Sequence, residues 1–295
     1  MAHRLASTCV VLLGLVAAAP AVAEPRLEVS PKKLRPGDPV LVTVRGVDHA
    51  PKGTGARTPL MFFPVRQGWQ AVFATPLDDA TTELKVVITD PALSETLAVT
   101  ARKWTEEQVK IDPEMAEPPA DKRKLIDGDN AAIVDALKDK SPPRFLTSFI
   151  LPSAGKGPKT SSFGAWRTLN GDYRSRHLGL DFGARKGSTV RSIQEGEVTL
   201  VRNGFLTGGT VVVSHGAGIA SSYFHLDDIK VTVGDKIKRG ATIGKVGLTG
   251  RTTGPHVHIG IWVPGGFIDP DAFFRLRLGP PIAPPAAPAT KSATK

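Results

Sequence analysis

The sequence predicts a mainly β protein in which two β domains are joined by a short helical segment. Between residues 26 and 104, short apolar runs alternate with polar residues and are separated by Gly, Pro, Asp and Ser. This pattern is typical of strands and turns. Between 105 and 144 the apolar spacing becomes that of a helix, and from 145 onward the chain is strand-rich again, with glycines at its turns.

The first 23 residues have the three parts of a secretory signal peptide. Arg4 gives a positive start, residues 5–19 are apolar or small, and Ala21-Val22-Ala23 fits a cleavage site. We therefore expect export to the periplasm or the medium, without an integral membrane span. Because the one cysteine, Cys9, lies in this segment, the mature chain would have neither disulfides nor a cysteine nucleophile.

The mature chain is predicted to be basic. Without residues 1–23 it has 37 Lys and Arg against 28 Asp and Glu, a net charge of +9. For an exported protein this charge favours anionic envelope polymers over nucleic acid as partners. A generally basic protein is the alternative, because no run of basic residues stands out.

Residues 24–104 are predicted to form an antiparallel, immunoglobulin-like β-sandwich that serves as an accessory domain. Val40, Val42 and Val44 alternate with polar residues after the turn sequence Pro36-Gly37-Asp38-Pro39, and similar short runs follow as far as residue 101. We find no catalytic pattern in this part of the sequence. Its candidate roles are binding a partner, binding the cell wall and shielding a site elsewhere in the chain.

Residues 105–144 are predicted to be a helical linker. Thr105-Glu106-Glu107-Gln108 fits a capping box, so we expect a short helix that begins there and ends before Pro113. A second helix is expected from Asp121 to the Ser141-Pro142-Pro143 stop, packed on one or both domains. Its apolar face would contain Leu125, Ile126, Ile133, Val134 and Leu137.

Residues 145–278 are predicted to form a compact antiparallel β domain. We expect a hairpin around Gly196 within residues 189–201, pairing of residues 210–214 with 220–224, and a last strand over 257–263. Residues 279–295 are a Pro/Ala/Lys tail with little to bury, and we expect no structure there.

Five of the seven histidines lie between residues 176 and 262. His177 and Asp181 form an H-x-x-x-D motif, and His256 and His258 form an H-x-H motif. Imidazole and carboxylate ligands suit zinc, which takes three protein ligands in catalytic sites and leaves a position for water. The other two histidines are His215 and His225.

Strand geometry restricts how these side chains can share an ion. Four residues along a straight strand span about 13 Å, which exceeds the combined reach of His177 and Asp181, so a bend near Gly179 is required. His256 and His258 would lie about 7 Å apart on one face. One of them can bind the metal while the other faces the reacting water, and the spacing does not decide which.

Several segments together closely resemble the lysostaphin and LytM type zinc endopeptidases of peptidoglycan, the DD-endopeptidase family. They are Ser161-Ser162-Phe163-Gly164, Asn170-Gly171, His177 to Ala184, Tyr223-Phe224-His225-Leu226, Val233-Gly234-Asp235, and Gly247 to His258. The resemblance covers about residues 149–274. The strands and helices before it look like the N-terminal domain that accompanies some of these peptidases.

This resemblance implies a metalloendopeptidase with one zinc ion per chain. His177, Asp181 and His258 would bind the metal, while His225 and His256 would be catalytic and face the water and the scissile peptide. The implied reaction is hydrolysis of peptide bonds in peptidoglycan cross-links or stem peptides. Which of His225 and His256 is the general base stays open.

Two other functions agree less well with the sequence. A non-catalytic peptidoglycan-binding or amidase-activating homologue typically loses zinc ligands, whereas all five key residues are present here. A lipoyl or biotinyl carrier module needs a lysine at a hairpin tip, whereas Lys236 and Lys238 flank a scaffold turn.

His215 is expected to form structural hydrogen bonds. Asn170 and Tyr173 are expected in an exposed loop, with the border of the substrate groove as the alternative.

Overall fold

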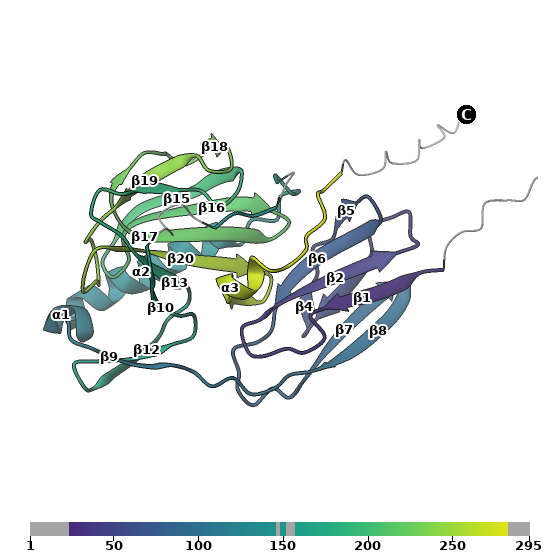
Figure 1. Ribbon diagram of the computed structural model, residues 1–295, viewed down its shortest axis with the longest axis horizontal. Helices are drawn as coiled ribbons and strands as arrows, with labels where there is room; N and C mark the ends of the chain where they lie inside the picture. Colours follow the sequence, from purple (N-terminus) through teal and green to yellow (C-terminus); the bar gives the residue numbers. More distant parts are fainter. Residues whose placement is uncertain (1–23, 146–147, 152–156, 283–295) are drawn as a thin grey trace, which may run out of the picture.

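The computed structural model describes residues 24–145, 148–151 and 157–282. Figure 1 shows two lobes, one built from the N-terminal strands and one from the C-terminal strands. The mainly β architecture is therefore confirmed. The predicted signal peptide and residues 283–295 of the predicted tail lie outside the described residues. Across the described ranges, no helix combines the length and apolar character needed to span a bilayer.

The N-terminal lobe contains two four-stranded antiparallel sheets, β1-β2-β6-β5 and β4-β3-β7-β8. Val40, Val42 and Val44 are fully buried, because alternate residues of a strand face the same side. Apolar side chains from both sheets form one core cluster. The strands are β1 (Arg26–Ser30), β2 (Pro39–Arg45), β3 (Lys52–Gly55), β4 (Thr58–Pro59), β5 (Phe63–Val65), β6 (Gly68–Ala74), β7 (Glu83–Asp90) and β8 (Ala92–Ala98).

The linker begins with a strand, so the helix predicted from Thr105 is wrong. Strand β9 (Glu106–Val109) pairs in parallel with β11 (Trp166–Leu169), which also pairs with β12 (Tyr173–Arg176). A few residues before Pro113 make a marginal helix, whereas the free edge of β11 satisfies their backbone groups. A short helix α1 (Pro113–Ala116) follows.

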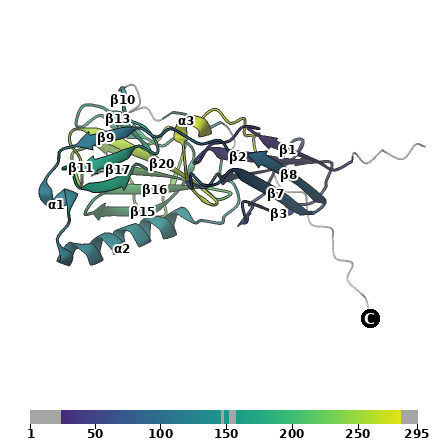
Figure 2. The same cartoon turned by 90° about the horizontal axis from the view of Figure 1, so that it is seen from below.

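The second predicted helix is present as α2 (Ala120–Leu137). Figure 2 shows α2 lying along β15 and β16 of the C-terminal lobe. Its residues Ile133 and Leu137 are buried against Val212 and Ala220. The helix therefore packs on the C-terminal domain through the later part of its predicted apolar face, whereas Leu125 of that face is 47% exposed, so the prediction was wrong for Leu125.

The C-terminal lobe contains a ten-stranded sheet with the central order β10-β13-β20-β17-β16-β15-β18. Its strands and helix are β10 (Lys159–Ser161), β13 (Leu180–Gly183), β14 (Thr189–Arg191), β15 (Gly196–Gly204), β16 (Gly208–Gly216), β17 (Ile219–Ile229), β18 (Lys236–Ile237), β19 (Thr242–Val246), β20 (His256–Val263), β21 (Gly266–Ile268) and α3 (Pro270–Phe273).

Of two strand pairings predicted in this lobe, one is confirmed and one is wrong. The pairing of 210–214 with 220–224 is confirmed by the β16–β17 register, in which Val211 is opposite Tyr223. The hairpin around Gly196 is wrong, because β14 pairs with β19 and Gly196 begins β15. Between β14 and β15 the Ser192 amide donates to Ala241 O, which directs the chain across the sheet instead of turning it back.

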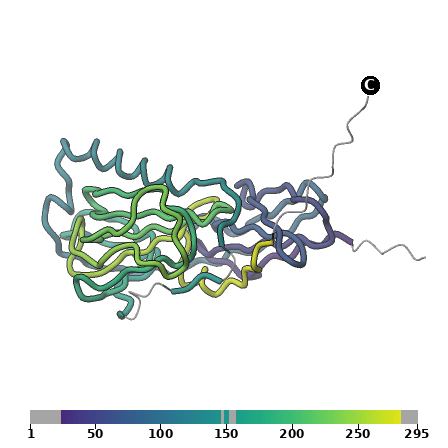
Figure 3. The backbone as a smooth tube through the Cα atoms, turned by 90° about the horizontal axis from the view of Figure 1, so that it is seen from above, coloured from purple at the N-terminus to yellow at the C-terminus, as the bar shows by residue number. Residues whose placement is uncertain are grey.

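The two lobes are joined by backbone hydrogen bonds and a shared apolar cluster. Ala74 N donates to Pro264 O at 2.9 Å, and Asp269 N donates to Gly37 O at 2.8 Å. Leu41, Phe63 and Val72 of the N-terminal lobe belong to the main core cluster of the C-terminal lobe. Figure 3 shows the resulting elongated molecule, with the two lobes end to end.

The first residues of the predicted tail also pack on the N-terminal lobe. Gly279 N donates to Gln70 Oε1 at 2.8 Å, and Ile282 N donates to Pro64 O at 3.0 Å. The expectation that the tail lacks structure does not hold for residues 279–282.

Candidate metal centre

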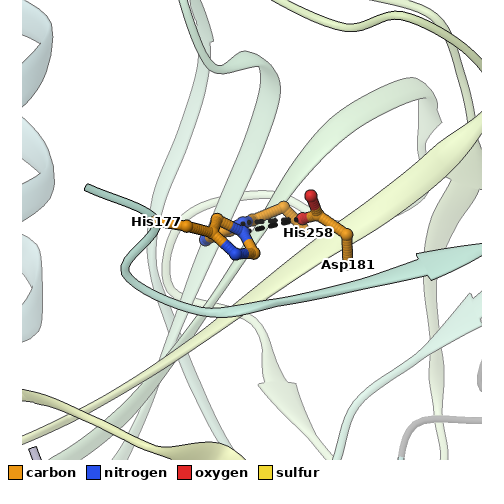
Figure 4. Close-up of side chains that lie close together, drawn as sticks. All are labelled: His177, Asp181 and His258. Carbon is orange, nitrogen blue, oxygen red and sulfur yellow. Dashed lines mark hydrogen bonds and ion pairs between the residues drawn. The ribbon is translucent and has the colours of Figure 1, made fainter. Parts of the chain in front are cut away.

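His177, Asp181 and His258 converge on one point in the C-terminal sheet (Figure 4). Asp181 Oδ1 lies 3.0 Å from His177 Nε2 and 3.0 Å from His258 Nδ1, and the two ring nitrogens are 2.8 Å apart. All three side chains are buried. The structure therefore brings together the three residues predicted to bind the metal.

Strand register produces this convergence. Asp181 in β13 is directly opposite His258 in the neighbouring antiparallel strand β20. The chain bends at Gly179, as the H-x-x-x-D spacing requires, and so returns His177 to the same point. A Cβ at residue 179 would lie 2.6 Å from the His258 ring, so only glycine allows this approach.

Neighbouring groups fix the orientation of each of the three side chains. His177 Nδ1 lies 2.8 Å from Ser162 O; a carbonyl can only accept, so Nδ1 carries the proton and Nε2 presents a lone pair. Asp181 Oδ2 accepts from Arg167 at 2.5 Å. The His258 ring stacks on Phe224, with centroids 4.9 Å apart and planes 4° apart.

The donor set fits a divalent metal such as zinc. Ligand atoms around tetrahedral zinc with bonds near 2.0 Å are separated by about 3.3 Å, close to the observed 2.8 and 3.0 Å. Burial would raise the pKa of Asp181, but its close contacts with His177 and His258 hold it well below its usual value. Burial lowers the pKa of His258 to about 4. At neutral pH the carboxylate is thus ionised and His258 neutral, as metal binding requires.

His225 lies beside this cluster at an irregularity in β17. The β16–β17 register shifts between Val211 and Gly209, and His225 has a φ of 65°, a conformation that non-glycine residues rarely adopt outside functional sites. Its Nδ1 lies 2.9 Å from Thr249 O, so Nε2 is left as a proton acceptor. Burial, followed by the nearby His256, lowers the pKa of His225 to about 3.

His256 is the second histidine beside the cluster. Its ring centroid is 4.7 Å from that of His225, and its Nε2 is 3.7 Å from Asp181 Oδ2. Its Nδ1 lies 2.8 Å from Gly254 O, which again leaves Nε2 free to accept a proton. Both histidines predicted to be catalytic are thus next to the three predicted ligands.

Two cavities flank these histidines, and each is walled by an element of the linker. One, of about 420 Å³, is lined by Asn130, Ile133 and Val134 of α2 together with the candidate centre. The other, of about 150 Å³, is lined by residues of β9, including Glu107 and Val109. No local pattern in residues 105–144 predicted that the linker takes part in the site.

Two arginines of the site were also missed. Arg167 and Arg251 line both cavities. Arg251 belongs to the segment from Gly247 to His258 that resembles the family. Its position close to His256 in the sequence could therefore have indicated that it lies in the site. Arg167 had no local signal, because its contacts are to Glu107 of β9 and Asp181 of β13, which only the folded chain brings beside β11.

The lesser candidates lie outside the cluster. His215 is fully buried, with Nδ1 2.8 Å from Glu195 O and Nε2 2.9 Å from Ser221 Oγ, in agreement with the predicted structural role. The Asn170 side chain binds both backbone polar groups of Ile111. Tyr173 is 38% exposed, but it begins strand β12, so the prediction of a loop was wrong for it. Neither Asn170 nor Tyr173 lines the two cavities.

Similarity to known proteins covers the same part of the chain. The peptidoglycan DD-endopeptidase ShyA of Vibrio cholerae is 42% identical over 89 residues, which are 30% of this chain and 21% of that protein. The DD-carboxypeptidase/endopeptidase Mpg of Neisseria meningitidis is 34% identical over 94 residues, 32% of this chain and 22% of that protein. The matches thus span about a fifth of the length of these relatives.

A crystal structure of an M23 peptidase from Pseudomonas aeruginosa shares more of the fold. It superposes with a TM-score of 0.62 at 27% identity, and the match covers 81% of this chain and 93% of that one. Residues 175–270 match the profile of peptidase family M23, and this range contains the three converging residues and both neighbouring histidines. The C-terminal domain of this chain is therefore a peptidase family M23 domain.

Proposed function

We propose that this protein is a zinc-dependent endopeptidase that hydrolyses peptide bonds in peptidoglycan cross-links or stem peptides. The observation that carries the proposal is the convergence of His177, Asp181 and His258, with two proton-accepting imidazoles beside them, inside an M23 domain. The names of the two curated relatives support the substrate class. One zinc ion per chain is proposed.

The chain's own residues would divide the chemistry between binding and proton transfer. His177, Asp181 and His258 would hold zinc, which lowers the pKa of a water and polarises a carbonyl when bound. His225 and His256 each present Nε2 toward the same region, and an imidazole there accepts a proton from the attacking water and returns it to the leaving amine. Burial keeps His225 neutral at ordinary pH, and the base is either His225 or His256.

We also propose roles for the N-terminal lobe, for residues 1–23 and for the net positive charge. The N-terminal lobe would be an immunoglobulin-like accessory domain, and its two sheets with one shared core support this. Export by residues 1–23 would place the protein in the periplasm or the medium, where peptidoglycan lies. The net positive charge supports contact with anionic envelope polymers.

A non-catalytic, peptidoglycan-binding or amidase-activating role is the alternative. It requires that the domain bind its polymer without hydrolysis. All three proposed ligands and both proposed catalytic histidines are present and in contact distance, so the enzymatic function is favoured.

Digestion of purified sacculi tests the proposal. We expect the full chain with zinc to release soluble fragments whose masses identify the cleaved bond. His225→Ala is expected to keep its zinc and to lose activity, because it removes a proton carrier and no ligand. His49→Ala, a change at an exposed histidine of the N-terminal lobe, is the matched control. Full activity of His225→Ala would remove that residue from the mechanism.

A further inference from the structure

The cavity beside α2 has a cationic lining. No aspartate or glutamate is present among the described residues that line it. The nearest carboxylate on the helix, Asp129, is held by Arg202 and by the Phe205 amide. The lining instead contains three arginines and three histidines: Arg167, Arg176, Arg251, His177, His225 and His258.

Two of the three arginines already have partners in the protein. Arg167 binds Glu107 and Asp181. Arg176 lies 3.9 Å from the Trp104 ring centroid, donates to Leu77 O and has Asp79 as an acidic partner at 3.9 Å, although its buried Nε and Nη2 have no hydrogen-bond partner among the described residues. The charges of Arg167 and Arg176 are therefore used to hold the fold and the metal centre together.

Arg251 differs from both. Among the described residues, its guanidinium has neither an acidic partner nor a hydrogen-bond acceptor, although it is partly buried. Burial and then the charge of Arg167 lower its pKa. A partly desolvated cation beside a second cation is unfavourable unless an anion is bound.

The backbone holds Arg251 in place for such an anion. Its amide donates to Leu206 O at 2.8 Å, and the preceding Gly250 has a φ of 71°. A Cβ at Gly250 would lie 2.4 Å from Gly208 N, so the loop is packed closely against the start of β16. Arg251 thus lies on a fixed loop and lines both cavities, next to the proposed catalytic histidines. The two carboxylates that line the smaller cavity, Glu107 and Asp181, are bound by Arg167.

We propose that Arg251 is the binding site for a carboxylate of the substrate, carried by a residue next to the scissile bond. This inference rests on the proposed function and assigns the substrate class: peptides with a free carboxylate at that place, in preference to neutral glycine-type or amidated peptides. A guanidinium binds a carboxylate through two parallel hydrogen bonds. The carboxylate comes either from the side chain of a diamino acid at the cross-link or from the chain terminus.

Three versions of one synthetic cross-linked stem peptide separate these sources. The first has every carboxylate free, the second has a carboxamide on the diamino acid at the cross-link, and the third has a carboxamide at the chain terminus. With the full-length zinc protein, we expect kcat/KM to fall about ten- to a hundredfold for one of the two amidated peptides. The peptide that loses activity identifies the carboxylate that Arg251 binds.

Variants of Arg251 connect this preference to the residue. On the peptide with every carboxylate free, the kcat/KM of Arg251→Gln is expected to fall to the value that wild type has on the disfavoured amidated peptide. On that amidated peptide, Arg251→Gln and wild type are expected to have the same kcat/KM. The zinc content of the variant is expected to equal that of wild type. Arg251→Lys is expected to regain part of the preference, because it keeps the charge. Arg66→Gln, at an exposed arginine of the N-terminal lobe, is expected to match wild type.

The inference is overturned if wild type cleaves all three peptides equally, or if Arg251→Gln slows all three by the same factor. Binding of fluorescent versions of the peptides, measured by anisotropy, keeps the test separate from the proposed function. If no peptide is cleaved, the proposed function fails. The carboxylate site would still be supported if wild type bound the free peptide with a Kd at least about ten times lower than that of Arg251→Gln. Equal Kd values would overturn it.

Discussion

At the scale of single residues, the histidine rings of the candidate centre are held in place through the nitrogen of each ring that faces away from the centre. The imidazoles of His177, His225 and His256 each turn Nδ1 toward a backbone carbonyl, at 2.8 to 2.9 Å. This contact sets the tautomer and the ring orientation before any ligand arrives. Each Nε2 is then available for a metal or for a proton.

Arg167 is expected to act as a positioning residue for Asp181. Its bond to Oδ2 leaves Oδ1 directed at His177 and His258. Arg167→Gln is therefore expected to weaken zinc binding about ten- to a hundredfold, measured by competition with a chelator of known affinity. Arg66→Gln is the control, and unchanged zinc affinity in Arg167→Gln would show that Asp181 needs no such partner.

His215 is expected to make stability depend on pH. Burial lowers its pKa from 6.5 to about 4, so between these values the unfolded chain binds a proton that the folded chain does not. The stabilisation is complete above pH 6.5 and is lost as the pH falls toward 4, by on the order of 3 kcal/mol. Urea unfolding of wild type and His215→Asn measures this: the stability difference between them should shrink as the pH falls. A difference that stays constant would contradict the assignment.

At the scale of secondary-structure elements, the linker completes the site that the M23 domain begins. Strand β9 and helix α2 precede the matched residues 175–270, yet each walls one of the two cavities. Their attachments are specific: β9 extends the β11–β12 pair, and α2 is buried on β16 and β17. Changes in the linker should therefore affect the site.

Asn170 is expected to hold the end of β9 in place. Its side chain forms two hydrogen bonds with Ile111, and its φ of 51° is one that glycine adopts without strain. Asn170→Gly thus removes the bonds without adding strain. We expect faster hydrogen exchange at residues 106–111, whereas Asn203→Ala at an exposed strand position should leave it unchanged. Equal protection in Asn170→Gly and wild type would show that β9 is held by its strand pairing alone.

The elements differ in how well local sequence predicts them. The alternation in β2 and the apolar spacing in the second half of α2 were sufficient, because each reports a face that is buried in the fold. Leu125, earlier in α2, is exposed although the spacing placed it on the same face. The capping-box pattern at Thr105 failed, because the edge of β11, about sixty residues later, offered better partners. Likewise, spacing predicted the bend at Gly179, but bringing His258 to Asp181 depends on β13–β20 register, which is a long-range pairing. The family resemblance supplied that part of the site.

At the scale of the whole molecule, Arg102 links the two lobes. It is 15% exposed and contacts Asp38 of the N-terminal lobe and Asp269 beside α3, whose side chains are 7% exposed. Its guanidinium also lies 5.0 Å from the Trp104 ring centroid. These ion pairs join the two lobes beside the apolar cluster that they share.

Arg102→Ala is expected to destabilise the protein by about 3 kcal/mol, because it leaves the buried carboxylate of Asp269 without a cation, whereas Asp38 keeps its contact with Arg35. The midpoint of urea unfolding measures this loss. Arg102→Lys should be less destabilising, and Arg57→Ala, at an exposed turn position, should change little. An unchanged midpoint in Arg102→Ala would mean that the lobes are held together by apolar contacts alone.

The central claim is that His177, Asp181 and His258 hold one zinc ion. Native mass spectrometry of the full chain, after exposure to zinc and removal of the excess, counts the bound ions directly. We predict one zinc per chain for wild type and none for His258→Ala, with both proteins folded by circular dichroism. A wild-type chain without zinc, or a His258→Ala chain that keeps it, would contradict the claim.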